Sequence, residues 1–380
     1  MTEQQLTMTT TAPSGLRSMT SVESVSAPVE EARLAPNPRN SQRNSQRNPA
    51  LDFTKGALVL IMVLYHWLNY FVGSQGDIYK YLRFLTPSFI FITGFLVSNV
   101  YLSRYGTPDP RLARRLAERS LKVFGVFLAL NVLRALLLSA ASRTQLLAQF
   151  ASVRSLVDVY VIGNVFVGAG QAKAVAFFVL VPIAYLLMLS AALLIVCHYF
   201  RYAFYAACGL GLAGIAVLQH YGLQSANLEL LTIGLLAVIC GYVPIGKING
   251  FVRHPHWLLL AYLGYLGMLN IWNVIYPVQV VGVFLSVMLI YLAGDAKGEP
   301  GRARRVVLLL GKYSLFGYIA QIAILQVLHQ VLGRSSLGEW AILGVSFVAA
   351  FALTILAVQL TDRARAGSPA IDRIYKVVFA

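Results

Sequence analysis

Charged side chains are scarce in this chain, and their scarcity excludes an ordinary soluble domain. Of its 380 residues only 12% are charged, whereas 58% are hydrophobic. A typical soluble domain has roughly 25% charged and 45–50% apolar residues. The composition therefore predicts a protein that lies largely in lipid.

Cysteines are also few, and they lack the spacing of metal ligands. The chain has 3 cysteines, Cys197, Cys208 and Cys240, which fall in or beside apolar runs. Because their number is odd and no histidine or acidic residue completes a ligand pattern, we interpret them as small packing residues. We expect no metal ion and no permanently bound cofactor.

The short alternating segments of a membrane β-barrel are missing too, and long apolar runs stand in their place. Runs of about 17–25 residues are the length that a helix needs to cross about 30 Å of hydrocarbon. Only a helix satisfies its backbone polar groups within such a run. We predict an all-α, polytopic integral membrane protein with about ten transmembrane helices, at roughly 51–72, 83–102, 118–139, 172–197, 201–219, 227–245, 256–271, 274–293, 306–328 and 338–360.

The start of the chain differs from the rest in composition. Residues 1–50 contain no apolar run and are rich in Ser, Thr, Asn, Gln, Arg and Pro. Such a segment buries too little surface to fold. Because no apolar core lies near Met1, we do not expect a signal peptide. We predict a disordered cytoplasmic tail over 1–50, a transmembrane domain over 51–361 and a short basic cytoplasmic tail over 362–380. The segment 153–168 has the pattern of an interfacial or re-entrant piece.

The distribution of the net charge of +16 indicates membrane topology rather than nucleic-acid binding. With the N-terminus inside, 24 of the 31 Lys and Arg residues fall in inner segments, 6 fall in outer segments and Arg134 lies within the membrane. Cytoplasmic loops carry such an excess of positive charge. We expect a multi-pass protein of the cell (inner) membrane with both termini cytoplasmic, surrounded by the lipid bilayer and not bound to nucleic acid. Arg134 either pairs with a carboxylate or snorkels to the outer interface.

The first predicted helix carries the densest set of polar residues, namely Asp52, Lys55, His66, Asn69 and Tyr70. The eleven residues from Lys55 to His66 make three turns plus about 20°, so these two side chains share a face and lie roughly 16 Å apart along the axis. Polar groups within a bilayer are functional candidates by default. This polar stripe lines either a tunnel or a buried interface. In the alternative interpretation, Asp52 and Lys55 are interfacial anchors and His66 is a hydrogen-bonded packing residue.

The same helix resembles a known family. The stretch Asp52–Gly56, followed by an apolar run into His66, is similar to the opening helix of the acyltransferase-3 family of polytopic membrane acyltransferases. That family has a basic residue, ten intervening residues and then a histidine. In this chain Lys55 stands in place of the usual arginine.

Three further stretches resemble motifs of that family in the same order, at Phe89–Leu96, Arg119–Phe124 and Leu310–Tyr318. Lys122 replaces a second motif arginine, and a lysine lacks the bidentate fork of an arginine. Gln321 lies where a second histidine often follows the last motif. The chain therefore resembles a divergent branch of the family.

This resemblance implies an acyl-CoA-dependent O-acyltransferase that moves an acyl group from cytosolic acyl-CoA to a hydroxyl of a cell-surface glycan or glycolipid. Lys55, Arg115, Arg119 and Lys122 would bind the phosphates of CoA at the inner mouth, although the positive-inside rule alone also accounts for such a cluster. His66 would act as a general base on the acceptor hydroxyl or attack the thioester itself.

An imidazole used in this way needs an orienting partner. Asp52 is roughly 21 Å away along the helix axis, too far to serve. We favour Glu229, within the sixth predicted helix, over Asp158 in an outer loop; Glu229 as a simple interfacial residue is the alternative. The remaining histidines fall at predicted helix ends or in loops, and we expect none of them to be catalytic: His198, His220, His254, His256 and His329.

Two other classes of protein remain open. A transporter or flippase for a lipid-linked or glycan precursor is the first alternative, although such proteins often contain inverted repeats and none is visible here. A binding or sensory membrane protein that kept the fold without the chemistry is the second.

Overall fold

The computed structural model describes the chain over residues 48–73, 77–102, 110–137, 143–144, 147–148, 150–164, 176–243, 255–271, 275–295 and 298–379. The chain divides into two units, Met1–Arg47 and Asn48–Ala380, and every described residue belongs to the second. Nearly all of the predicted tail over 1–50 therefore lies outside the described residues.

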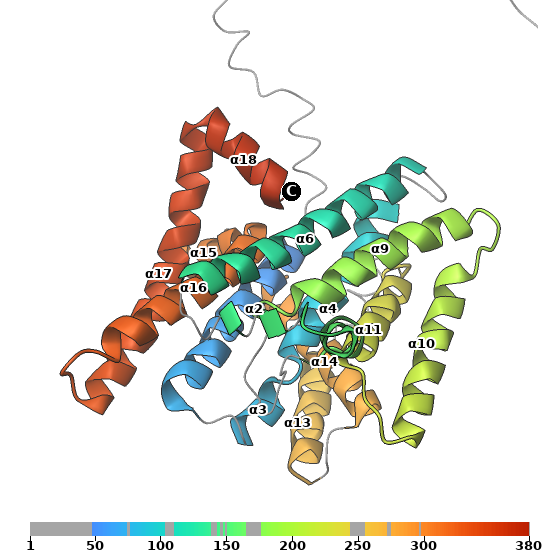
Figure 1. Cartoon of the computed structure of the whole chain (residues 1–380), viewed down its shortest axis with the longest axis horizontal. Coiled ribbons are helices and arrows are strands. Elements are labelled where there is room, and N and C mark those ends of the chain that lie inside the picture. The colour runs from blue at the N-terminus through green and yellow to red at the C-terminus, as the bar shows by residue number, and fades with distance from the viewer. Residues whose placement is uncertain are drawn as a thin grey trace, which may run out of the picture. The chain divides into compact units, whose positions relative to one another are not determined.

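Regular secondary structure in the described part is entirely helical, which confirms the predicted all-α class (Figure 1). The elements are α2 Pro49–Trp67, η2 Leu68–Val72, α3 Asp77–Leu82, α4 Leu85–Leu96, η3 Val97–Leu102, α6 Pro110–Leu137, α8 Val153–Leu156, η4 Val157–Ile162, α9 Leu180–Val196, α10 Ala203–His220, α11 Ala226–Cys240, α13 Pro255–Ile271, α14 Tyr276–Gly294, α15 Arg302–Lys312, α16 Ser314–Leu332, α17 Glu339–Gly367 and α18 Pro369–Phe379. The elements labelled η are π-helical turns.

Six of the described helices are long and apolar enough to cross a membrane, which indicates a multi-pass membrane protein. They cover Pro49–Val72, Lys80–Asn99, Ala203–His220, Tyr276–Gly294, Ser314–Leu332 and Glu339–Gly367. Helices α9, α11 and α13 are apolar but shorter, and α6 begins with a basic stretch. Each of the ten predicted segments contains a helix, but six crossings rather than ten meet the criterion of length and composition.

The predicted helix at 306–328 is wrong in one respect, because the structure divides it. Tyr313 lies in a turn between α15 and α16, with φ −113° and ψ 29°. The basic residues before it extend α15 back to Arg302, so that α15 is an amphipathic helix ahead of the apolar α16. Past the predicted end at residue 360, α17 continues to Gly367 and is followed by α18.

Helix α2 packs against five other helices, α4, α14, α15, α16 and α17. The contact with α15 is close because each helix contributes a glycine. A Cβ at Gly56 would collide with the carbonyl oxygen of Val307, and a Cβ at Gly311 would collide with that of Asp52. Small residues allow helices in lipid to approach in this way. The start of α2 is fixed by Asn48, whose side chain accepts a hydrogen bond of 2.9 Å from the amide of Ala50.

A second group of helices is built on the pairs α6–α9, α4–α11 and α10–α11. Ser120 of α6 donates a hydrogen bond of 2.7 Å to the carbonyl of Ala184 in α9. Both groups share one apolar core, which contains Met62 of α2, Phe127 of α6 and Ile233 of α11.

The described part of the predicted re-entrant segment 153–168 is the short α8 followed by η4. Its irregular backbone is satisfied by side chains of neighbouring helices. The carbonyl of Tyr160 accepts hydrogen bonds from the Tyr185 hydroxyl and the Asn227 amide, both at 2.9 Å. The carbonyl of Val161 accepts one of 3.1 Å from Ser225. Irregular backbone at membrane depth requires such partners inside the protein.

Candidate functional site

The polar stripe predicted for the first helix lies on one regular α-helix. Because α2 is α-helical from Pro49 to Trp67, Lys55 and His66 do share a face. Lys55 Nζ lies 2.5 Å from Asp52 Oδ1, with side chains only 19% and 12% exposed. Lys55 is therefore a partly buried cation held by a carboxylate of its own helix. His66 is half-buried, and its ring packs edge-on against Tyr65 at 5.0 Å.

The face of α2 that carries His66 lies against α16. A Cβ added at Gly317 of α16 would be 3.3 Å from Val59 Cγ1. Farther along both helices, the ring of His329 lies 5.8 Å from the ring of Tyr70. From the first contact to the second, the residue numbers increase on both helices, so α2 and α16 run in parallel.

This parallel register brings His66 and Gln321 to the same side of the contact between the two helices. Val59 and Gly317 mark the line of contact. Around the axis of α2, His66 lies about 20° short of the direction of Val59, because seven residues fall about 20° short of two turns. Around the axis of α16, Gln321 lies about 40° past the direction of Gly317, because four residues exceed one turn by about 40°. Two parallel helices turn in the same sense but face each other from opposite directions. A negative offset on one helix and a positive offset on the other therefore point to the same side of the contact. The rise of about 1.5 Å per residue puts the two side chains within about one helical turn of each other in height.

Gln321 is fully buried, with 0% of its surface exposed. Within the described residues, neither its Nε2 nor its Oε1 has a hydrogen-bond partner. A buried amide without partners is unusual, because desolvating it costs free energy that no bond returns. The amide of Gln321 therefore has an unmet capacity for hydrogen bonds in the interior of the bundle.

Two phenols complete this cluster. Tyr318 lies one turn before Gln321 on α16, is buried, and is close enough to Tyr65 of α2 for an electrostatic interaction. Its ring is 6.4 Å from that of Phe89 in α4 and 6.2 Å from that of Phe177. We call Tyr65, His66, Tyr318 and Gln321 together the α2–α16 seam.

Phe177, which packs against the seam, has an unusual backbone. Its φ of 59° is the one positive value among the non-glycine residues that the structure describes. This left-handed conformation is strained for a bulky residue, and such strain concentrates at functional sites. The conformation is held by Asn131 of α6, whose amide accepts from the Ala176 N–H at 2.9 Å and donates to the Ala176 carbonyl at 3.0 Å.

Tyr70 and His329 extend the polar stripe beyond the seam, toward the end of α2. The ring of His329 is also 5.6 Å from Phe71, and Arg134 of α6 lies within electrostatic range of the Tyr70 hydroxyl. His329 lies in the last turn of α16, at a helix end as expected, and it was not predicted to belong to the site. The spacing in the sequence could have indicated His329 as a site residue. Tyr318 and His329 are eleven residues apart and therefore share a face of α16, just as Lys55 and His66 share a face of α2.

Glu229, the favoured partner of His66, has its observed contact with α14. It is half-buried in the first turn of α11, and its backbone carbonyl accepts a hydrogen bond of 3.2 Å from the Tyr276 hydroxyl. Helix α11 packs against α4, α9 and α10, whereas His66 lies on the α16 side of α2. The structure therefore groups Glu229 with Tyr276.

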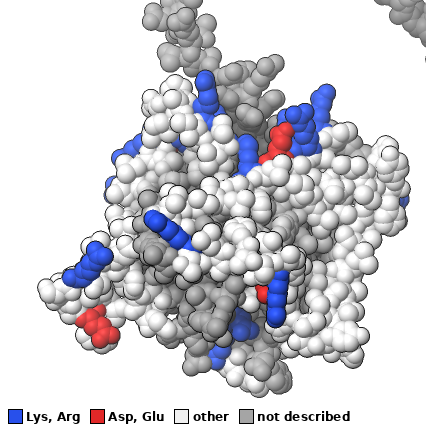
Figure 2. Space-filling view, viewed as in Figure 1, with Lys and Arg blue, Asp and Glu red and all other residues white. Residues whose placement is uncertain are grey.

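The predicted phosphate-binding residues lie on two helices. Arg115, Arg119 and Lys122 are exposed on α6, while Lys55 is on α2. Figure 2 shows several Lys and Arg side chains in the upper part of this face, and others at mid-height on the left and in the lower part, with broad uncharged surface between them. Lys122 Nζ donates a hydrogen bond of 3.5 Å to the carbonyl of Lys376, so α18 lies directly against the basic stretch of α6.

An ion network holds α18 in this place. Asp372 lies 2.6 Å from Arg365 of α17 and 2.5 Å from Lys376. Hydrogen bonds from Lys376 and Arg365 hold the pKa of Asp372 below its ordinary value, and burial raises the pKa of Tyr375 to about 12. The stabilisation from Asp372 is therefore present above its ordinary pKa and is lost as the pH falls through the depressed value.

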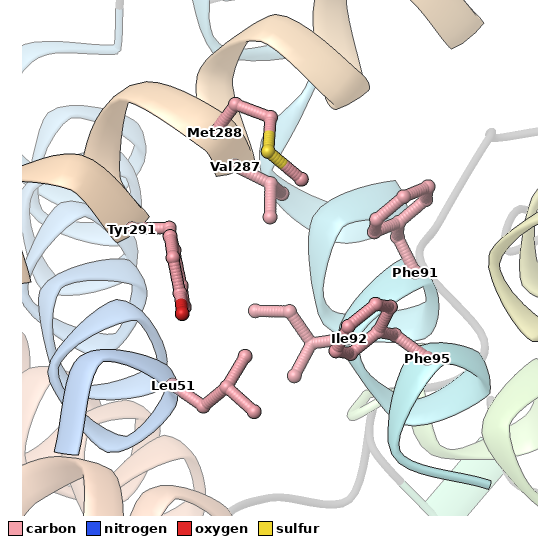
Figure 3. Close-up of a pocket in the computed structure, with 7 residues that line it drawn as sticks. All are labelled: Leu51, Phe91, Ile92, Phe95, Val287, Met288 and Tyr291. Atoms are coloured by element: carbon pink, nitrogen blue, oxygen red, sulfur yellow. The ribbon is translucent and has the colours of Figure 1, made fainter. Parts of the chain in front are cut away.

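A small apolar pocket lies between α2, α4 and α14. Figure 3 shows its lining side chains converging from the three helices: Leu51, Phe91, Ile92, Phe95, Val287, Met288 and Tyr291. The Tyr291 hydroxyl accepts a hydrogen bond of 3.2 Å from the Asn48 side chain. The pocket can hold an apolar group near the start of α2.

Taken together, these residues offer a base, hydrogen-bond donors and apolar walls within a helical bundle. Among the described residues, no group of three or more His, Cys, Asp or Glu is placed to hold a metal ion. The four family-like motifs lie on α2, α4, α6 and across the α15–α16 turn, and the first and last of these meet at the α2–α16 seam. In comparisons with known proteins, no family model, no curated protein and no solved structure matches the chain.

Proposed function

We propose that this protein is a membrane-bound, acyl-CoA-dependent O-acyltransferase that acylates a hydroxyl of a cell-surface glycan or glycolipid. The observation that carries the proposal is the α2–α16 seam, where the imidazole of His66 and the buried amide of Gln321 lie on the same side of the contact between two helices. The four sequence motifs give the seam its reaction class, because the first and the last of them lie on these two helices.

The chemistry follows from the positions of the residues. His66 accepts the proton of the acceptor hydroxyl as its oxygen attacks the thioester carbonyl. The carbon–sulfur bond then breaks, and the CoA sulfur leaves with the proton that His66 returns. Arg115, Arg119 and Lys122 are exposed on α6, where they are accessible to the phosphates of CoA, and each phosphate oxygen would accept a charge-assisted hydrogen bond.

The test uses the full chain in lipid nanodiscs, with radiolabelled acyl-CoA and glycolipids extracted from cells that lack the protein. Wild type should release CoA and label the glycolipid. His66→Gln keeps a hydrogen-bonding side chain without a base, so transfer should fall by about 10²–10⁴-fold. His220→Gln, an exposed substitution at the end of α10, is the matched control and should leave transfer unchanged. Normal transfer by His66→Gln would overturn the role of His66, and no labelling by wild type would overturn the reaction.

A transporter or flippase is the second candidate, and one observation favours it. The α8–η4 segment is a short helix that continues as a π-helical turn, and neighbouring helices bond to its carbonyls; broken helices also occur at the binding sites of many transporters. A flippase would move a fluorescent lipid-linked glycan across a vesicle bilayer without acyl-CoA. The acyltransferase would label it only when acyl-CoA is supplied.

A further inference from the structure

Gln321 is the buried polar residue whose environment is least explained by packing. The two other glutamines of α16, Gln326 and Gln330, are partly or fully exposed, whereas Gln321 is 0% exposed. Within the part of the chain that the structure describes, its amide nitrogen and its carbonyl oxygen both lack a hydrogen bond. An apolar residue of the same shape would remove this unfavourable burial, so the amide is retained at a cost to stability.

The neighbours of Gln321 include residues that could take part in a reaction. The side chain lies on the His66 side of the α2–α16 contact and within about one helical turn of His66. Next to it on α16, the Tyr318 ring contacts Phe177, whose left-handed backbone is fixed by Asn131. A buried amide, a candidate base and the neighbour of a strained residue therefore lie along the same side of the α2–α16 contact.

We propose that Gln321 donates a hydrogen bond from its amide nitrogen to the carbonyl oxygen of the acyl donor. The proposal rests on the acyltransferase function given above. When the acceptor oxygen attacks, negative charge develops on that carbonyl oxygen, and a donor already in place stabilises it. As the carbonyl forms again, the carbon–sulfur bond breaks and the proton held by His66 passes to the CoA sulfur. Gln321 undergoes no covalent change, and its amide is satisfied only while the donor is bound.

A purely structural amide and a substrate-binding amide predict opposite effects on stability. If Gln321 bonded to the protein, its replacement by an apolar isostere would destabilise the fold, because its partner would be left unsatisfied. If its partner is the substrate, the same replacement removes a desolvation cost from the empty protein and raises its stability.

The experiment compares wild type with Gln321→Met, which keeps the length of the side chain and removes its polar atoms. In nanodiscs, kcat for acyl transfer should fall by about 10²–10³-fold, as for the loss of an oxyanion donor. KM for acyl-CoA should stay within about twofold, because the phosphates bind on α6. The apparent melting temperature without substrate should rise by about 2–4 °C.

Ser190→Ala is the matched control. Ser190 in α9 is also fully buried with an unpartnered hydroxyl, but α9 packs against α6, α4, α10 and α11 rather than α16. Its replacement should leave melting temperature unchanged or raised and kcat unchanged. A Gln321→Met protein with normal kcat, or with a lowered melting temperature, overturns the proposal while wild type is active. Failure of wild type to transfer the acyl group from acyl-CoA overturns the proposed function itself, and these results are distinct.

Discussion

Asn131 and Phe177 illustrate how a single side chain can hold a strained backbone next to a site. The amide of Asn131 both donates to and accepts from the backbone of Ala176, and it also donates 3.0 Å to the carbonyl of Phe127 in its own helix. A left-handed phenylalanine persists only where the surrounding structure enforces it. These bonds, made by one buried residue of α6, provide that enforcement.

Asn131→Leu should therefore destabilise the protein by about 1–3 kcal/mol, because the buried N–H and carbonyl of Ala176 lose their partner. Release of Phe177 should also reduce acyl transfer, since the Phe177 ring packs against Tyr318. Thermal unfolding in nanodiscs measures the first effect. Gln219→Ala removes an exposed amide from α10 and should change little. Equal stability of Asn131→Leu and wild type would show that the bonds to Ala176 do not hold the turn.

The exposed cations of α6 permit a second prediction at this scale. Arg119→Gln should raise KM for acyl-CoA about tenfold, the loss expected for one charge-assisted hydrogen bond of about 1.4 kcal/mol. KM for the acceptor should stay the same. Arg114→Gln is the control, because Arg114 is paired with Glu118 at 2.8 Å on the same stretch. A matching rise in both KM values for Arg119→Gln would indicate a structural role.

At the scale of elements, the pairing of α2 with α15 and α16 decides what the first helix does. Glycines at the α2–α15 crossing bring the two backbones into contact. After the turn at Tyr313, α16 continues alongside α2 and presents Gln321 to the side that carries His66. The turn is anchored by a hydrogen bond of 2.6 Å from the Tyr313 hydroxyl to Asp362 of α17.

Gly311→Ala tests this contact. The added methyl group would overlap the carbonyl of Asp52, so the helices must separate, at a cost of about 1–3 kcal/mol. Gly344→Ala in α17 is the matched control, because a Cβ there meets no atom within 4 Å. We expect a lower melting temperature and weaker transfer only for Gly311→Ala. A Gly311→Ala protein as stable as the control would contradict the close approach of α2 and α15.

At the scale of the whole helical unit, the contacts place its two ends on the same side. Asp52 near the start of α2 touches Gly311 just before α16, and Tyr313 bonds to Asp362 near the end of α17. Because α2 and α16 are parallel and α17 follows α16 after a short loop, α17 returns to the side on which α2 begins. An even number of crossings, as the basic residues predict, would require this arrangement.

Reporter fusions test the side of the membrane. Fusions at residues 145 and 335 should read as external and a fusion at residue 370 as internal, because 24 of the 31 basic residues lie in the segments assigned to the inside. A fusion in the loop at residue 222 adds a further external point. An external reading at residue 370 would contradict the topology.

The sequence by itself determined the features that depend on one helix at a time. Long apolar runs specify membrane helices, since lipid leaves the backbone no other way to bond. The shared face of Lys55 and His66 follows from the period of a helix, and the structure confirms it. The break at Tyr313 was missed because the apolar residues continue on both sides of it.

Only the tertiary structure decided which helices meet. The period of α2 gives the face that carries His66 but not the helix that covers it, and that helix proved to be α16. The buried amide of Gln321 and the strained φ of Phe177 arise only when the helices pack together. Neither feature can be predicted from the sequence of a single segment. For the same reason Glu229 has the right residue type and depth in the sequence yet lies with Tyr276 in the fold.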